Sequence, residues 1–320
     1  MIKGRAKRIV AQTGFRFGVL VLALLTLVAT FAEWIAADAP LYLNYQGHAY
    51  VLPSVTESGP FHGLGAERIA TALGPHDTAI WPVFRAGPST VTAEAPLSGA
   101  SRAHWLGTDA FGRDVLVRLV YATRSSLGLG AAVALLAATI GLFIGCFSGT
   151  LGGVFSGLLE RSVEVASVFP AVVAIALVRA TERTPSLLAL VVVVTAVEAA
   201  IIARLVHILV LRTLTEEFVM GARAMGGTRL EITFRHVGPH LAAPLAVAAI
   251  FATASAVLIE TSLSFLDLGV PPRIASWGEM LGEIRWGAGP HIVLPPLVAL
   301  GLTVGALYAM ANAVRRAFEA

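Results

Sequence analysis

The chain is poor in charged residues, and lysine is almost absent from it. Only 13% of the 320 residues are charged, and the two lysines, Lys3 and Lys7, both stand near the N-terminus. A phosphate-binding loop of the form GxxxxGK[ST] needs a lysine, so none exists downstream of these positions. The formal net charge of +3 is small, and the arginines form no basic stripe of the kind that binds nucleic acid. We expect this chain to bind neither ATP nor nucleic acid.

Motifs of metal binding and covalent catalysis are also missing. Cys146 is the single cysteine, so an internal disulfide is excluded. There is no HExxH pattern and no EF-hand pattern in the sequence. Four histidines precede the second apolar run at spacings of 14, 14 and 28 residues, which predicts no compact metal site: His48, His62, His76 and His104. We expect no catalytic residue, metal site or cofactor in this chain.

Apolar residues are present in excess, at 56% of the chain. About 45–50% is usual in soluble domains. They fall into six runs near the roughly 20 residues that a membrane-spanning helix needs: residues 17–32, 126–148, 162–180, 186–209, 241–266 and 292–314. The third run is the weakest because Pro170 interrupts it, and a re-entrant segment is the alternative there. We expect an all-α integral membrane protein with six transmembrane helices.

Basic residues predict the orientation, because short loops rich in lysine and arginine stay in the cytoplasm. With six spans the basic N-terminus, the region from Arg204 to Arg235 and the tail with Arg315 and Arg316 fall on one side. Both termini are therefore expected in the cytoplasm. A cleaved signal peptide is the alternative for the first run, but Trp34 extends that run as an interface anchor and favours a retained span.

Four regions follow from these spans: the cytoplasmic N-terminus with the first span (1–36), an extracytoplasmic segment (37–123), a core with five spans (124–316) and a cytoplasmic tail (317–320). The second region is too long for a simple turn. Its glycines and Asp109 predict a turn that caps a helix beginning near Arg113. An apolar stripe opposite Arg113 and Arg118 favours a helix lying on the bilayer before the second span.

The loop between the fourth and fifth spans, residues 211–240, predicts two short helices. Each helix has residues that fit a capping box at its start, Thr213 with Glu216 and Thr228 with Glu231. Between them, Gly226 and Gly227 offer the left-handed conformation that ends one helix and starts a turn.

The first helix of this loop is predicted to be amphipathic. Phe218, Ala222 and Met225 share one face at spacings of four and three. An ordinary interfacial connector between two spans is the alternative to a functional loop, since amphipathic character alone does not separate the two.

The residue order of the loop resembles the EAA loop of ABC-importer permeases, with Ala222 followed by Gly226 and a closing Pro239. Three other segments are similar to the oligopeptide, dipeptide and nickel branch of that family, and the earliest of them to its microcin C and oligopeptide subgroup: residues 31–53, 104–127 and 260–281. The loop departs from the family at four positions, where Met220 replaces glutamate, Gly221 replaces alanine, and Gly238 and His240 replace the common leucine and asparagine.

The resemblance implies a type I ABC importer permease for peptides or peptide-like solutes in the bacterial inner membrane. It implies a heterodimer with a second permease, two cytoplasmic ATPase subunits that bind ATP and Mg, and an extracytoplasmic solute-binding protein. This chain would be a non-catalytic subunit. Its loop would receive the movement that the ATPase subunits make when they bind ATP, through the following residues: Thr213, Glu216, Glu217, Met220, Gly221, Ala222, Arg223, Gly226, Gly227, Thr228, Glu231, Arg235, His236 and Pro239.

Two acidic residues, Glu198 and Glu260, lie inside expected spans, where an ionisable group is costly unless it faces partner helices or a water-filled path. A place on the translocation path and a structural hydrogen bond both remain open for them. A proton-coupled secondary transporter would use one of them and is an alternative function. Others are an ABC permease for nickel or another small solute, and a membrane scaffold that acts through residues 37–123.

Overall fold

A computed structural model describes residues 9–56, 64–92, 95–151, 153–181 and 186–319. The basic stretch at residues 1–8, His62 and Arg183 lie outside the described residues. By its contacts the chain divides into two compact units. Unit 1 consists of Met1–Leu22, Gly128–Leu263 and Leu302–Ala320, and unit 2 consists of Ala23–Leu127 and Ser264–Gly301.

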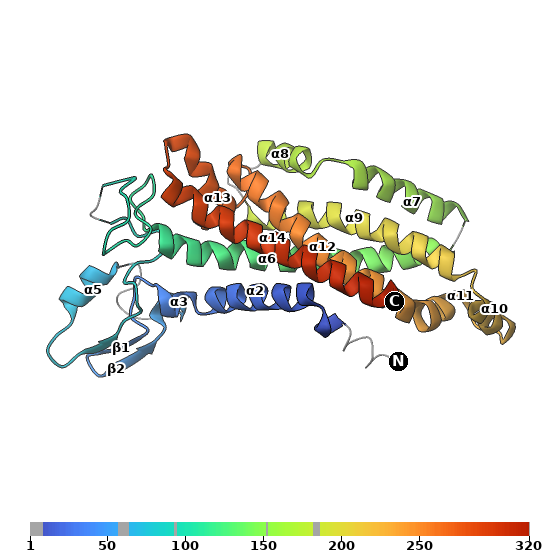
Figure 1. The fold of residues 1–320 in the computed structure, drawn as a ribbon, viewed down its shortest axis with the longest axis horizontal. Coiled ribbons are helices and arrows are strands. Elements are labelled where there is room, and N and C mark those ends of the chain that lie inside the picture. The colour runs from blue at the N-terminus through green and yellow to red at the C-terminus, as the bar shows by residue number, and fades with distance from the viewer. Residues whose placement is uncertain (1–8, 57–63, 93–94, 152, 182–185, 320) are drawn as a thin grey trace. The chain divides into compact units, whose positions relative to one another are not determined.

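Long apolar helices dominate the described chain (Figure 1). Five of them are long and apolar enough to cross a membrane: α2 (Thr13–Thr30), α6 (Val115–Leu151), α9 (Leu187–Thr213), α12 (Gly238–Phe265) and α14 (Pro290–Glu319). They cover five of the six expected runs. The helical membrane class predicted from the sequence is therefore confirmed, and the chain is mostly helical.

The remaining run folds as two helices, α7 (Gly153–Val168) and α8 (Ala171–Thr181), which lie along α9 within unit 1 (Figure 1). Neither helix is long enough to cross a membrane by itself, and the chain bends by 87° between them. Pro170 stands at the break, where it lacks the N–H that a continuous helix would need. The described chain thus has five spans, or six if this bent pair crosses the membrane.

Helix α6 begins at Val115, close to the helix start predicted near Arg113, but the expected separation of that helix from the second span was wrong. No separate interfacial helix ends at residue 123, because α6 runs for 37 residues from Val115 without a break. Asp114 caps this helix by accepting a hydrogen bond from the Val117 N–H at 2.9 Å, and it also pairs with His104 at 2.6 Å. The polar segment before the span therefore ends in the first turns of the spanning helix itself.

Within unit 1, glycines set the approach of α6 to α9. Gly141, Gly145 and Gly149 follow one another at four-residue spacing, so they share one face of α6. A Cβ atom at Gly145 would lie 2.5 Å from Val206 Cβ and 2.6 Å from the Ala203 carbonyl oxygen. Glycine is needed here because it lets two helices pack backbone against backbone.

Unit 2 contains a small antiparallel sheet that the sequence did not predict. Its order is β2–β1–β3, from β2 (His48–Val51), β1 (Tyr42–Tyr45) and β3 (Thr78–Ile80). A tight turn at Gln46 and Gly47, both with positive φ, joins the first two strands. Short helices complete the unit: α3 (Ala32–Ile35), α4 (Pro53–Thr56), α5 (Ala66–Ala72), α13 (Trp277–Gly282) and the 3-10 helix η2 (Glu283–Trp286).

Candidate functional site

The loop between α9 and α12 folds into α10 (Glu217–Ala224), α11 (Arg229–Ile232) and a π-helical turn η1 (Thr233–Val237) (Figure 1). Gly226 has φ +89°, and the N–H groups of Gly226 and Gly227 donate to the Arg223 and Ala222 carbonyls at 2.9 and 3.2 Å. These two bonds and the left-handed residue form a Schellman motif. The predicted glycine turn is confirmed at Gly226.

Only one of the two predicted helix caps forms. The Glu231 N–H donates to Thr228 Oγ1 at 3.3 Å, as a cap requires. Thr213 instead belongs to α9, and its hydroxyl donates to the Leu209 carbonyl at 2.8 Å. The first capping box was wrong because α9 continues four residues beyond its expected end at residue 209, which places Thr213 inside a helix.

The buried face of α10 also differs from the predicted one. Val219 and Ala222 are buried, whereas Phe218 is exposed and Met225 is 84% exposed. Phe218 stacks on the ring of His240 at a centroid distance of 5.0 Å. Periodicity placed Ala222 correctly but could not show which of its neighbours turns toward the core.

The loop and the spans share one hydrophobic core in unit 1. Val219 and Ala222 of α10 and Ile232 of α11 lie in the same cluster of buried side chains as Val206 and Val210 of α9. Helix α10 is therefore connected to α9 through this shared cluster as well as by the chain. A displacement of α10 has to move its neighbours in this cluster, because protein interiors are close-packed.

The opposite side of the loop is exposed and carries charges of both signs. Glu231 and Arg235 pair loosely there, at 3.6 Å between Glu231 Oε1 and Arg235 Nη1. Exposed residues among the predicted coupling residues include the following: Glu216, Glu217, Met220, Gly221, Arg223, Gly226, Thr228, Glu231, Arg235 and Pro239. This surface is accessible to a partner protein.

Both acidic residues of the expected spans are buried within the chain. Glu198 of α9 is 3% exposed and accepts a hydrogen bond from Ser255 Oγ of α12 at 2.5 Å. Glu260 is 0% exposed. The Ser255 bond supports the structural alternative for Glu198, and a place on the translocation path stays a prediction for both residues.

Sequence reasoning missed a buried cluster of charges in unit 2, the arginine–carboxylate cluster, which consists of Asp109, Arg113, Arg118, Glu279 and Glu283. Arg118 is 1% exposed and bonds to Asp109, Glu279 and Glu283, the last at 3.2 Å. Arg113 contacts Asp109 at 2.6 Å and Glu283 at 3.3 Å. The cluster ties the first turn of α6 to α13 and η2.

Asp109 has two roles in this cluster. It accepts hydrogen bonds from the backbone N–H groups of Phe111 and Arg113 at 2.8 and 2.9 Å, which confirms the predicted turn. Its other oxygen pairs with the two arginines, which lie four and nine residues farther along. The signal available in the sequence was an arginine, Arg118, within an otherwise apolar helical stretch.

Burial has a large effect on the acids of this cluster. It raises the pKa of Glu283 to about 8, although Arg118 opposes the rise, and it raises the pKa of Glu279 and of Asp109 in the same way. Three carboxylates face two arginines here, so one negative charge has no cationic partner. A proton on Glu283 relieves that excess near neutral pH.

These observations define the class of the molecule: a helical, multi-pass membrane protein in which an exposed loop of short helices is packed into the core of its spans. Comparison with known proteins identifies the family. The family model described as "Binding-protein-dependent transport system inner membrane component" matches residues 141–320.

Three relatives are similar over most of the chain. A protein of Brucella suis biovar 1 (strain 1330) that bears a peptide permease name is 36% identical over 236 residues, 72% of this chain and 78% of the relative. The dipeptide transport system permease protein DppC of Alkalihalophilus pseudofirmus is 34% identical over 226 residues, 70% and 74% of the two chains. The glutathione transport system permease protein GsiD of Pectobacterium atrosepticum is also 34% identical over 226 residues, 69% and 74%.

The chain therefore belongs to the family of inner membrane components of binding-protein-dependent transport systems. The resemblance to ABC-importer permeases read from the loop and the three flanking segments is confirmed. Members of this family are transport components of the membrane that work, in general, with ATPase and binding-protein partners.

Proposed function

We propose that this chain is a non-catalytic permease subunit of an ATP-driven importer of peptides or peptide-like solutes. The peptide, dipeptide and glutathione names of its relatives support the solute class. In this proposal the chain forms half of the translocation pathway beside a second permease. Two ATPase subunits bind ATP and Mg at its cytoplasmic side, an extracytoplasmic protein delivers the solute, and both termini are cytoplasmic.

The observation that carries the proposal is the core shared by the loop and the spans. Val219 and Ala222 belong to the same buried cluster as Val206 and Val210 of α9, while the other side of α10 offers an exposed surface to an ATPase. When ATP binding closes the ATPase pair, a helix seated on it moves as a rigid body. The shared core passes that motion to α9 and so to the solute pathway.

Gly226 offers a direct test, because the chain has a matched glycine elsewhere. Gly226 and Gly47 have φ +89° and +81°, and a Cβ atom at either position would meet nothing within 4 Å. Replacing either one by tryptophan imposes similar backbone strain, and neither position has a neighbour that would collide with the new Cβ atom. Gly226→Trp changes the loop surface, whereas Gly47→Trp changes only the β1–β2 turn.

Solute uptake and ATP hydrolysis are measured together in proteoliposomes that contain the complete transporter. We expect the Gly226→Trp complex to assemble and hydrolyse ATP but to lose most of its uptake per ATP, while Gly47→Trp keeps it. Full coupling in the Gly226→Trp complex contradicts the assignment of this loop. Equal loss in both variants points to backbone strain instead and also contradicts it.

A second measurement separates this proposal from a proton-coupled secondary transporter. Such a transporter works without ATPase subunits and uses an ion gradient. Purified chain in liposomes with a proton gradient is expected to show no uptake, and the complete complex with ATP is expected to show it. Gradient-driven uptake by the chain alone, lost in Glu198→Gln, would overturn the proposal.

A further inference from the structure

The α6–α9 pair in unit 1 is the frame on which this inference rests. At Gly145 and Gly149 no side chain separates the helices, and the Val206 and Val210 side chains of α9 fill the space that a Cβ atom would occupy. Close-packed glycine contacts leave little room for one helix to slide on the other. Contacts of this kind favour movement of the two helices together.

One end of this pair is hydrogen-bonded to the loop between α9 and α12. Thr150 of α6 and Thr233 of η1 are both buried, and their hydroxyl oxygens lie 2.9 Å apart. Thr150 directs its own proton to the Cys146 carbonyl at 2.6 Å. Because a hydroxyl group carries a single proton, Thr233 is the donor in the bond between them. The loop is thus attached to α6 by a directed bond.

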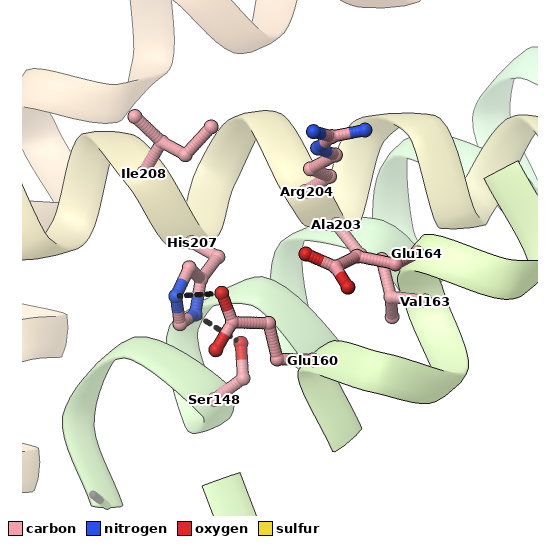
Figure 2. A pocket seen from close by; sticks show the side chains of 8 residues that line it. All are labelled: Ser148, Glu160, Val163, Glu164, Ala203, Arg204, His207 and Ile208. Carbon is pink, nitrogen blue, oxygen red and sulfur yellow. Dashed lines mark hydrogen bonds and ion pairs between the residues drawn. The ribbon is translucent and has the colours of Figure 1, made fainter. Parts of the chain in front are cut away.

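Close to this attachment, His207 of α9 lies between α6 and α7. Figure 2 shows its imidazole between Ser148 of α6 and Glu160 of α7, with Nδ1 2.8 Å from Ser148 Oγ and Nε2 3.7 Å from Glu160 Oε1. His207 is 8% exposed, and Ser148 is 4% exposed. The three side chains line a pocket of about 110 Å³.

Ser148 has two acceptors for its single proton, and the charge of His207 decides between them. The hydroxyl can donate to His207 Nδ1 when that nitrogen has no proton, or to the Gly145 carbonyl at 3.1 Å. A protonated imidazole donates from Nδ1 to Ser148 Oγ, and its positive charge attracts the Glu160 carboxylate, which lies 3.7 Å from Nε2. Protonation therefore turns Ser148 toward Gly145 and adds an ion pair between α9 and α7.

The other groups that face His207 leave Glu160 as its charge partner. Glu164 of α7 and Arg204 of α9 line the same pocket, and Glu164 has its ion pair with Arg161 at 2.7 Å. In Figure 2 the Arg204 guanidinium points away from the imidazole. Arg235 and His236 of η1 do not line this pocket.

We propose that His207 is a positioning residue for coupling, which links α7 to the α6–α9 pair more tightly when it is protonated. The inference rests on the proposed function, since it assumes that the loop receives the ATPase stroke. The movement of the ATPase subunits reaches α6 through the hydrogen bond between Thr233 and Thr150. The charge of His207 then sets how closely α7 and α8 move with the α6–α9 pair. Uptake per ATP is then highest at acidic pH on the ATPase side.

The test is the pH profile of uptake per ATP in proteoliposomes with the complete transporter. The pH is varied over about 5–8. We expect uptake per ATP by the wild-type transporter to fall as the pH rises. In His207→Gln and Glu160→Gln, uptake per ATP is expected to be independent of pH and equal to the wild-type value at high pH. Glu164→Gln, a carboxylate change on the same helix and pocket, is expected to keep the wild-type profile.

Hydrogen exchange of α7 in the intact complex provides a second measurement. It would not depend on pH in this way if His207 had a purely structural role. At low pH, α7 of Glu160→Gln is expected to exchange faster than α7 of Glu164→Gln, and the difference is expected to vanish at high pH. A His207→Gln complex that keeps the wild-type pH profile overturns the inference, as does an equal effect of Glu160→Gln and Glu164→Gln.

The two proposals fail in different ways. Full coupling in Gly226→Trp overturns the loop assignment and this inference with it. A flat wild-type profile together with an uncoupled Gly226→Trp complex overturns the role of His207 alone.

Discussion

The two units hold their helices together with different chemistry. Unit 2 uses the arginine–carboxylate cluster, in which Arg118 contacts three acids in a buried site. In unit 1 the contacts of α6 with α9 and with the loop use hydroxyl groups and one imidazole, in the Thr150–Thr233 and Ser148–His207 contacts, while Ser255 and Glu198 join α12 to α9. A typical neutral hydrogen bond contributes about 1 kcal/mol, whereas breaking a buried ion pair costs about 3–5 kcal/mol.

The difference indicates which contacts can change during a transport cycle. A buried charge that loses its partner is left without water or a counter-ion, so the unit 2 cluster fixes one geometry. A hydroxyl group can exchange one acceptor for another at small cost, as Ser148 can between His207 and Gly145. The segments proposed to transmit motion are the ones joined by exchangeable bonds.

The largest expected effect is at Arg118. Arg118→Ala leaves Asp109, Glu279 and Glu283 buried without their main counter-ion, and the free energy of unfolding is expected to fall by about 3–5 kcal/mol. The measurement is thermal unfolding of the purified transporter, together with the amount of chain found in the membrane.

The matched control for this change is Arg124→Ala on the same helix. Arg124 also pairs with a glutamate, Glu33, but its side chain is 47% exposed, so the loss is expected to stay within about 0–1 kcal/mol. Similar losses in the two variants would show that burial of the cluster does not set its strength.

A smaller effect is expected at the glycine contact of unit 1. In Gly145→Ala the new methyl group overlaps Val206 and the Ala203 carbonyl, and overpacking of this kind costs about 1–3 kcal/mol. In Gly128→Ala, on the same helix, the methyl group meets nothing within 4 Å, and a gain of up to about 1 kcal/mol is expected from helix propensity. Thermal unfolding compares the two; equal stabilities would contradict the tight α6–α9 contact.

The smallest effect is a pH dependence that belongs to unit 2. The pKa of Glu283 is raised by burial to about 8, against 4.5 for an ordinary glutamate, so its protonated form favours the folded state. That contribution is complete below pH 4.5 and is lost as the pH rises through 8. Between about pH 7 and pH 9 the loss amounts to about 1 kcal/mol.

Glu283→Gln removes this titration and provides the check. Its thermal stability is expected to change less than that of wild type between neutral and alkaline pH. An unchanged slope in the variant would assign the pH dependence to another group of the cluster, because burial also raises the pKa of Glu279 and of Asp109.

The spans were predictable because apolar length is a local property of the sequence. A helix beginning near Arg113 was predicted, but the burial of its first turn was not, since the partners of Arg118 lie about 160 residues downstream, at Glu279 and Glu283. The local pattern predicts that Arg118 lies on the polar side of a helix at the membrane surface. Only the folded chain shows that acids from another segment surround it.

The candidate loop was predictable in its turn but not in its packing. Gly226 was predicted correctly because the left-handed residue that follows the end of a helix is usually glycine. The predicted cap at Thr213 was wrong because the sequence does not show where α9 ends. The predicted apolar face of α10 was wrong because contacts with distant parts of the chain determine that Val219 is buried. The polar contacts of His207 join three helices and have no local signature at all.

The bent pair α7–α8 has a consequence for how the protein enters the membrane. Helix α7 carries Glu160, Arg161 and Glu164, and a charged side chain near the centre of an inserting helix costs about 2.5–3.5 kcal/mol. The insertion machinery meets this pair before α9 has been synthesised, yet in the folded chain both helices pack along α9. We therefore expect α7 and α8 to take their places late, once α9 has emerged and offers them a surface other than lipid.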